Sequence, residues 1–150
     1  MTKEAAEAVL QSGTLLRESW TKGGKNYDVN ARPLLQAITD DVKKQKSRLG
    51  GDFAVAHTVP TRVSRDLIRK ELGTEVIFIL LNLTVECQTE RLIRRHGKET
   101  EGIAEIMRQV HKLTEAAETD EPNAINVTIE VDDTRQSVLE KVLKHATSTT

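Results

Sequence analysis

The chain has a single cysteine, Cys87, and very few aromatic residues, which make up 3% of its 150 residues. One cysteine excludes an internal disulfide and is usual in a reducing compartment. So few aromatic rings, together with a formal net charge of −1, argue against nucleic acid or an anionic membrane surface as a partner. No apolar run approaches the roughly 18 residues that a membrane helix needs, and a basic-then-apolar signal pattern is lacking. We therefore expect a soluble, cytoplasmic protein.

Apolar residues account for 37% of the chain, and Val76–Leu81 is an unbroken run of six. A strand with one wet face would alternate apolar and polar residues, so this run predicts a strand covered on both faces, as in parallel sheets flanked by helices. We predict an α/β fold with strands over about 53–59, 76–83 and 124–131. The first two, joined by a helix, would form a right-handed βαβ unit, with chemistry at the carboxyl ends of the strands.

Apolar residues at helical spacing predict the helices of this fold. Asn30 is expected to cap a helix that runs through Pro33 and ends at Gly50. Asp133, with Gln136 three residues later, is typical of a capping box before the last helix. The predicted helices cover residues 3–20, 31–49, 61–73, 85–97 and 100–117, and the last one follows Asp133.

The turn after the first predicted strand could bind an anionic or polyhydroxylated substrate. Thr58 is expected to cap the next helix, whose free N–H groups favour anions. Arg62 and Arg65 follow on one helix face and could grip such a ligand. Alternatively, Arg65 pairs with a nearby carboxylate on a wet surface, which is the interpretation we favour for Arg69. His57 either hydrogen-bonds at the strand end or contacts the substrate.

A second cationic group lies at the end of the helix over 85–97, where Arg91, Arg94 and Arg95 precede Gly97. A guanidinium forks onto phosphate oxygens and keeps its charge, so phosphoryl-transfer sites recruit arginines. The alternative role is compensation of the helix dipole. The four histidines are scattered and lack the spacing of metal ligands, so we predict no metal site built from them.

A glycine-rich phosphate loop is not recognisable in the sequence. That motif needs a glycine, four residues, then Gly-Lys-Ser or Gly-Lys-Thr between a strand and a helix. Gly24-Lys25 is followed by Asn26, and no apolar strand precedes it. We therefore expect the stretch Thr21–Asn30 to be a loop without a phosphate cradle.

Several segments resemble the gluconate kinase branch of the P-loop small-molecule kinases, a superfamily that also includes nucleoside and shikimate kinases. The resemblance covers roughly residues 28 to 146. It rests on five motifs in the expected order: ARPLLQAITDDV at 31–42, AHTVPTRVSRDLIRKELG at 56–73, IFILLNLT at 77–84, ERLIRRHG at 90–97, and EAAETDEPNAINVTIEVD at 115–132.

The resemblance implies a three-layer kinase fold that uses ATP and Mg²⁺ to phosphorylate a hydroxyl of a small sugar acid. Arg65 is similar to the substrate-side arginine of the family, and Arg91 and Arg95 are similar to its lid arginines, which contact phosphates. Residues 132–135 would border the adenine pocket. The implied cofactor residues are therefore Arg95, Asp133 and Arg135.

The sequence departs from the family in its first segment, because residues 1–30 show neither the first strand nor the phosphate loop. The lid histidine expected after Gly97 is Lys98 here. We expect a single domain with a kinase-like core over 31–146 and a frayed tail over 147–150. Two interpretations stay open: the carboxyl-terminal part of a kinase that is inactive alone, or a non-catalytic interaction module. In both, a second copy or an N-terminal partner could complete the sheet.

Overall fold

Helices form most of the structure, a computed structural model that describes residues 3–21, 26–52, 54–97 and 100–147. The stretch 22–25, Phe53, Lys98 and the predicted tail beyond 147 lie outside the described residues. The chain divides into two compact units. Unit 1 contains Met1–Val76 and Gln109–Glu115, and unit 2 contains Ile77–Arg108 and Ala116–Thr150.

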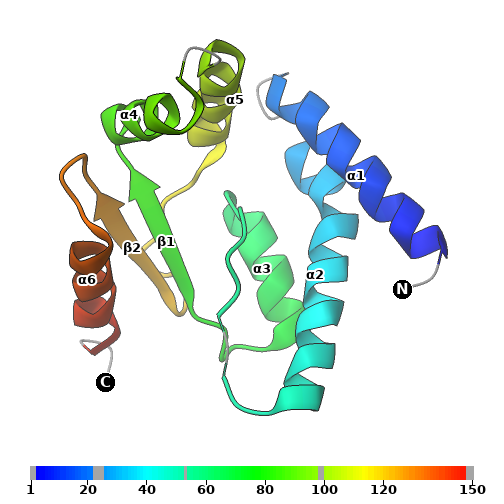
Figure 1. The fold of residues 1–150 in the computed structure, drawn as a ribbon. Coiled ribbons are helices and arrows are strands. Elements are labelled where there is room, and N and C mark those ends of the chain that lie inside the picture. The colour runs from blue at the N-terminus through cyan, green and yellow to red at the C-terminus, as the bar shows by residue number, and fades with distance from the viewer. Residues whose placement is uncertain (1–2, 22–25, 53, 98–99, 148–150) are drawn as a thin grey trace. The chain divides into compact units, whose positions relative to one another are not determined.

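Unit 1 is built on three helices, α1 (Lys3–Thr21), α2 (Tyr27–Leu49) and α3 (Arg62–Leu72). Both α1 and α3 pack against α2, as Figure 1 shows. The contact between α1 and α2 includes a 2.8 Å hydrogen bond from Asn30 Nδ2 to Ser19 Oγ. The buried apolar side chains of this unit are Leu16, Tyr27, Ala31, Leu35 and Ile68.

The start of α2 differs from the prediction. The helix begins at Tyr27, after Asn26, whose φ of 62° is left-handed. Asn30 is therefore not the cap but a residue of the first turns, and its side chain is used in the contact with α1. The predicted end is confirmed: Gly50, with a φ of 64°, follows the helix, and its N–H donates to Lys46 O.

The predicted strand over 53–59 is wrong for the residues described there, because residues 54–60 have no regular secondary structure. Its short apolar run is mostly exposed, and Val55 is 54% exposed. An extended segment becomes a strand when a neighbour supplies hydrogen-bond partners for its backbone. The strand predicted to be its neighbour pairs elsewhere.

Unit 2 contains a parallel pair of strands, β1 (Phe78–Leu83) and β2 (Ala124–Ile129). Their register runs from Phe78 opposite Ala124 to Leu83 opposite Ile129. The connection between them contains α4 (Val85–His96) and α5 (Thr100–Leu113), the end of which belongs to unit 1. The α/β class and two of the three predicted parallel strands are thereby confirmed.

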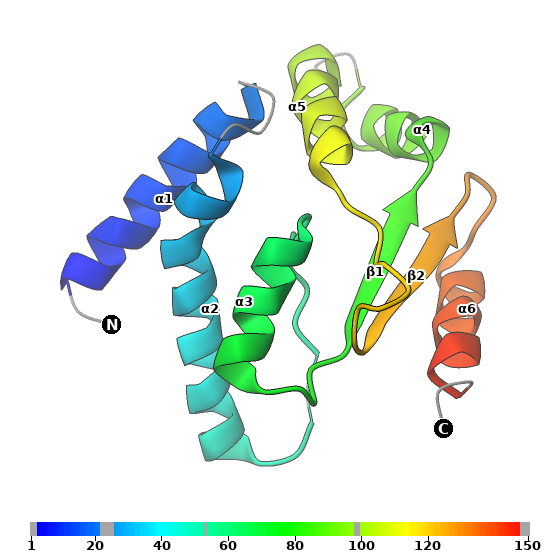
Figure 2. The same ribbon diagram turned by 180° about the vertical axis from the view of Figure 1, so that it is seen from behind.

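The sheet is covered more fully over β2 than over β1. The helix α6 (Arg135–Thr147) packs beside β2, a contact seen from both sides in Figures 1 and 2. Val127 and Ile129 of β2 are buried, whereas Ile79 and Leu81 of β1 are exposed. The prediction that both faces of the Val76–Leu81 run are covered is therefore wrong for these residues, because cover depends on packing partners and not on composition.

Candidate functional site

The carboxyl ends of β1 and β2 are each followed by a helix, β1 by α4 after Thr84 alone and β2 by α6 after the loop 130–134. Thr84 N donates to Ile129 O at 3.3 Å and so extends the ladder by one residue. Thr84 then caps α4, because its hydroxyl accepts a 3.2 Å hydrogen bond from Cys87 N. The buried Cys87 thiol lies 3.5 Å from Glu130 O, at the end of β2. This edge of the sheet is where α/β proteins generally bind ligands.

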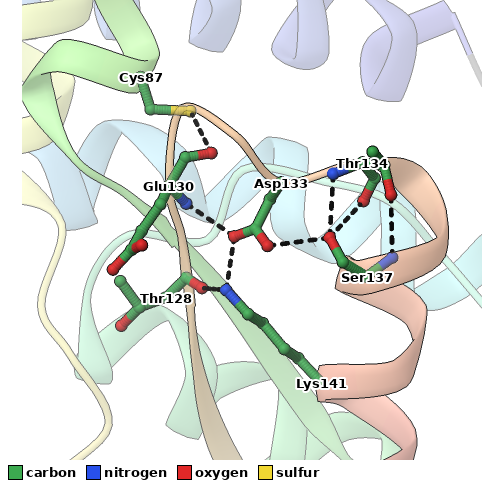
Figure 3. A network of polar contacts seen from close by, with 7 residues as sticks. All are labelled: Cys87, Thr128, Glu130, Asp133, Thr134, Ser137 and Lys141. Carbon is green, nitrogen blue, oxygen red and sulfur yellow. Dashed lines mark hydrogen bonds and ion pairs between the residues drawn. The ribbon is translucent and has the colours of Figure 1, made fainter.

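The loop after β2 is organised by the carboxylate of Asp133 (Figure 3). Its Oδ2 accepts hydrogen bonds from Glu130 N, at 2.8 Å, and from Lys141 Nζ, and its Oδ1 accepts one from Ser137 Oγ at 2.9 Å. The backbone N–H of Glu130, followed by Lys141 and Ser137, lowers the pKa of Asp133 to about 2. Asp133 therefore stays ionised and fixes the turn between β2 and α6.

The cap of α6 lies one residue later than predicted. Thr134 Oγ1 accepts from Ser137 N at 3.2 Å, and Ser137 Oγ accepts from Thr134 N at 2.9 Å. This is the reciprocal pattern of a capping box, with Thr134 and Ser137 in place of the predicted Asp133 and Gln136. Asp133 instead lies before the helix and is held by Lys141 of α6, which also donates to Thr128 O at 3.1 Å.

The predicted phosphate-contacting arginines lie on the surface of α4. Arg91 and Arg95 are exposed and are one helical turn apart. Arg94, between them in sequence, is paired with Glu90 at 2.5 Å. In the part of the chain that the structure describes, neither Arg91 nor Arg95 forms an ion pair. Their guanidinium groups are thus available to an anionic ligand.

The predicted substrate residues lie in unit 1, around the start of α3. Thr58 is exposed and is not the cap: Thr61 caps α3 by accepting from Ser64 N at 3.2 Å. Arg62 is partly buried, and its backbone N–H donates to Glu115 Oε2 at 2.6 Å. His57 Nδ1 lies 2.9 Å from Thr58 O. The predicted setting of this hydrogen bond, a strand end, is wrong, because residues 54–60 form no strand.

Arg65 is completely buried, although it was considered for a substrate or a wet surface. Its Nη1 donates to Pro60 O at 3.3 Å and to Glu115 O at 3.2 Å. The interpretation of a wet-surface ion pair is therefore wrong. For Arg69 the predicted carboxylate pairing is confirmed, because its Nη1 lies 2.7 Å from Asp66 Oδ1. The predicted wet surface is wrong, because Arg69 is buried.

Two residues that organise this region were not found from the sequence, Asp28 and Glu115. Asp28 Oδ1 accepts hydrogen bonds from the hydroxyls of Thr61 and, at 3.0 Å, of Ser64. Glu115 N donates to Pro60 O at 2.7 Å. The residues in each of these contacts are more than 30 positions apart in the sequence, so a local sequence pattern does not predict that they meet. They give the start of α3 a dense set of polar partners.

The predicted site residues thus fall into two groups. Thr58, Arg62 and Arg65 belong to unit 1, and the predicted catalytic and cofactor residues belong to unit 2. Two surface hollows lined by described residues of unit 2 have volumes of about 290 and 220 Å³. The larger is lined by Asn126, Val127, Thr128, Lys141, Lys144 and His145, and the smaller by Val85, Gln88, Thr89, Leu92, Ala104 and Arg108. Neither hollow includes Arg91, Arg95, Asp133 or Arg135.

Within the described ranges, acidic, histidine and cysteine side chains do not gather in a group of three that could hold a metal ion. Among the same residues, no helix has both the length and the apolarity that crossing a membrane requires. Comparison with known proteins found no matching family model, no matching curated protein and no matching solved structure.

Proposed function

We propose that this chain is the carboxyl-terminal part of an ATP-dependent kinase of the gluconate kinase type, which phosphorylates a hydroxyl of a small sugar acid. The observation that carries the proposal is the parallel β1–β2 pair, whose carboxyl ends each lead into a capped helix N-terminus. Helix N-termini at such an edge favour phosphate groups through their free N–H groups and dipoles. The five sequence motifs of the family provide the second support.

The residues of unit 2 suit the periphery of a bound nucleotide. Arg91 and Arg95 are exposed at a spacing of one turn, so both can reach the same phosphate chain. Arg135 is exposed at the first position of α6, next to the loop that Asp133 fixes. In this proposal Asp133 is a positioning residue, because both of its oxygens already accept hydrogen bonds from the protein.

The residues present do not fit the centre of an MgATP site. The sequence contains no glycine-rich phosphate loop, and the described residues contain no acidic cluster for Mg²⁺. Kinases accelerate transfer almost entirely by positioning and by electrostatic stabilisation of the phosphoryl group. We therefore propose that the chain alone does not catalyse transfer, and that a partner carrying the phosphate loop is needed.

The experiment combines MgATP titration with an assay of gluconate phosphorylation. We expect MgATP to raise the unfolding temperature at millimolar concentration, and inorganic triphosphate to do so less, because it lacks the adenosine. Replacing both Arg91 and Arg95 by alanine should abolish the shift. Arg94→Ala on the same helix is the matched control, because Arg94 is paired with Glu90. No turnover is expected from any of these proteins.

The second candidate function is a non-catalytic interaction module of kinase-like origin. It is favoured by the burial of Arg65, whose guanidinium binds backbone carbonyls and presents no exposed surface to a substrate. The two candidates separate in the titration. A chain whose stability does not respond to MgATP supports the interaction module, whereas phosphorylation of gluconate by the chain alone contradicts the proposed inactivity.

A further inference from the structure

The backbone of β1 offers a second hydrogen-bonding edge, on the side away from β2. Phe78 N donates to Asn123 O at 2.8 Å, and Thr84 N donates to Ile129 O at 3.3 Å. Backbone groups alternate in direction along a strand, so the even-numbered residues between them also face β2. The N–H and C=O groups of Ile79, Leu81 and Leu83 therefore point to the other edge. In the described part of the chain, β1 pairs with β2 alone.

This outer edge lacks the features by which proteins normally block strand addition. The ten residues Val76–Val85 contain no charge, no proline and no glycine. Apolar side chains along the strand are open to solvent: Ile77 is 62% exposed, Ile79 44% and Leu81 48%. Natural edge strands usually carry a lysine, a proline or a bulge that prevents pairing. An uncharged and apolar edge is instead suited to accept another strand.

We propose that the outer edge of β1 pairs with the same edge of a second copy, antiparallel and about a twofold axis, to form a four-stranded sheet in the order β2–β1–β1–β2. A twofold axis places odd-numbered residues opposite odd-numbered ones, so the outward N–H and C=O groups of the two copies meet. Residues directly opposite share a face. Ile79 and Leu81 of both copies thus extend the apolar face that contains Val127 and Ile129.

The lack of charge in Val76–Val85 permits pairing with a second copy, and the short length of β1 limits the strength of that pairing. Because Val76–Val85 is uncharged, antiparallel registers within it place no like charges opposite each other, which would oppose pairing. A six-residue strand is only about 20 Å long. The contact is therefore smaller than the roughly 1,200–2,000 Å² of a standard stable interface. The dimer should be weak and concentration-dependent. This inference does not depend on the proposed function, and a strand that completes a kinase sheet would compete for the same edge.

The test measures the molar mass of the full chain by sedimentation equilibrium over a concentration series. We expect a reversible monomer–dimer equilibrium for the natural sequence. Leu81→Lys puts a charge on the edge and should leave a monomer at every concentration. Leu139→Lys is the matched control: Leu139 lies on α6 and is 50% exposed, so its replacement should leave the dimer unchanged. Circular dichroism checks that each variant is folded, and Ile77→Lys replaces Leu81→Lys if that variant unfolds.

Two outcomes overturn the proposal. One is a natural chain that remains monomeric over the whole series. The other is a dimer that survives both Leu81→Lys and Ile77→Lys, because its interface then lies elsewhere. The geometry is checked with spin labels on single cysteines in a Cys87→Ser background. Labels at position 81 should give a shorter distance between copies than labels at position 139, and the reverse order contradicts the β1–β1 contact.

Discussion

The guanidinium of Arg65 donates a hydrogen bond to the backbone carbonyl of Glu115, fifty residues further along the chain, at 3.2 Å. The same nitrogen lies 3.3 Å from the carbonyl oxygen of Pro60, whose oxygen also accepts from Glu115 N. Arg65 has no exposed surface. Its charge is thus solvated by the protein backbone, and the side chain joins α3 to the segment that follows α5.

We expect Arg65→Ala to lower the free energy of unfolding by about 3 kcal/mol, since charge-assisted hydrogen bonds contribute about 1.5–3 kcal/mol and the carbonyl of the buried Pro60 loses a partner. Urea denaturation followed by circular dichroism measures the change. Arg62→Ala, three residues away and partly exposed, is the control and should cost less than about 1 kcal/mol. Equal losses for the two variants would contradict a special role for Arg65.

The contact between Asp28 of α2 and the cap residue Thr61 of α3 gives a second prediction. Asp28→Ala removes the acceptor of two largely buried hydroxyls, and we expect a loss of about 2 kcal/mol. Combining it with Thr61→Ala in a double-mutant cycle should show a coupling of at least about 0.5 kcal/mol. Asp41→Ala, at an exposed position of α2, is the control. Strict additivity of Asp28→Ala and Thr61→Ala would show that the contact does not stabilise unit 1.

Tyr27 is the single tyrosine, so its ionisation can be followed by ultraviolet absorbance. Burial, with a smaller contribution from the charge of Asp28, raises the pKa of its hydroxyl to about 12. The folded state thus favours the neutral phenol. The stabilisation is complete below pH of about 10, where the unfolded chain begins to ionise, and is lost as the pH rises to about 12. Tyr27→Phe should remove this part of the alkaline loss of stability. Titration of Tyr27 in the folded chain near 10 would refute the prediction.

Asp133 should produce the opposite dependence in acid. Its pKa of about 2 lies below the ordinary value near 3.9, because Glu130 N–H, Lys141 and Ser137 stabilise the carboxylate. The stabilisation is present above pH of about 4 and is lost as the pH falls towards 2. Asp133→Asn should flatten the dependence of the unfolding midpoint on pH in this window. Asp132→Asn, at the exposed neighbouring position, should keep the slope of the natural chain, and a matching loss of slope there would contradict the assignment to Asp133.

The strands β1 and β2 could be predicted because their signal is local. Val76–Leu81 is apolar throughout and Ile125–Val131 alternates, and both patterns are typical of strands whatever the tertiary context. The segment 53–59 carries a similar but weaker pattern, but its described residues, 54–59, do not pair with a strand. Strand formation requires a second strand as well as a suitable sequence, and the pairing of β1 with β2 could not be distinguished from pairing with 53–59 by composition.

The candidate site was predicted less well than the fold, for a related reason. The caps were expected at Thr58 and Asp133 but are Thr61 and Thr134, because several neighbouring residues can each accept a helix N–H and tertiary contacts decide among them. Asp28 selects Thr61 from 33 residues away. The burial of Arg65 could not be predicted either, because the helical spacing of the arginines does not show which face of α3 packs against the rest of the unit.

Unit 1 contains the late segment Gln109–Glu115, so it cannot be completed when its first 76 residues have been synthesised. Residues 1–76 emerge first, but the partner of Arg65 and of Arg62 N–H emerges about forty residues later. At roughly 5–20 residues per second, this delay lasts seconds, longer than helix formation and collapse need. During that time β1 and α4 are made while α3 still lacks its last contacts. Unit 1 can therefore be completed only after residues 77–108 of unit 2 have been made. A nascent chain halted before Glu115 should carry Arg65 without its Glu115 partner.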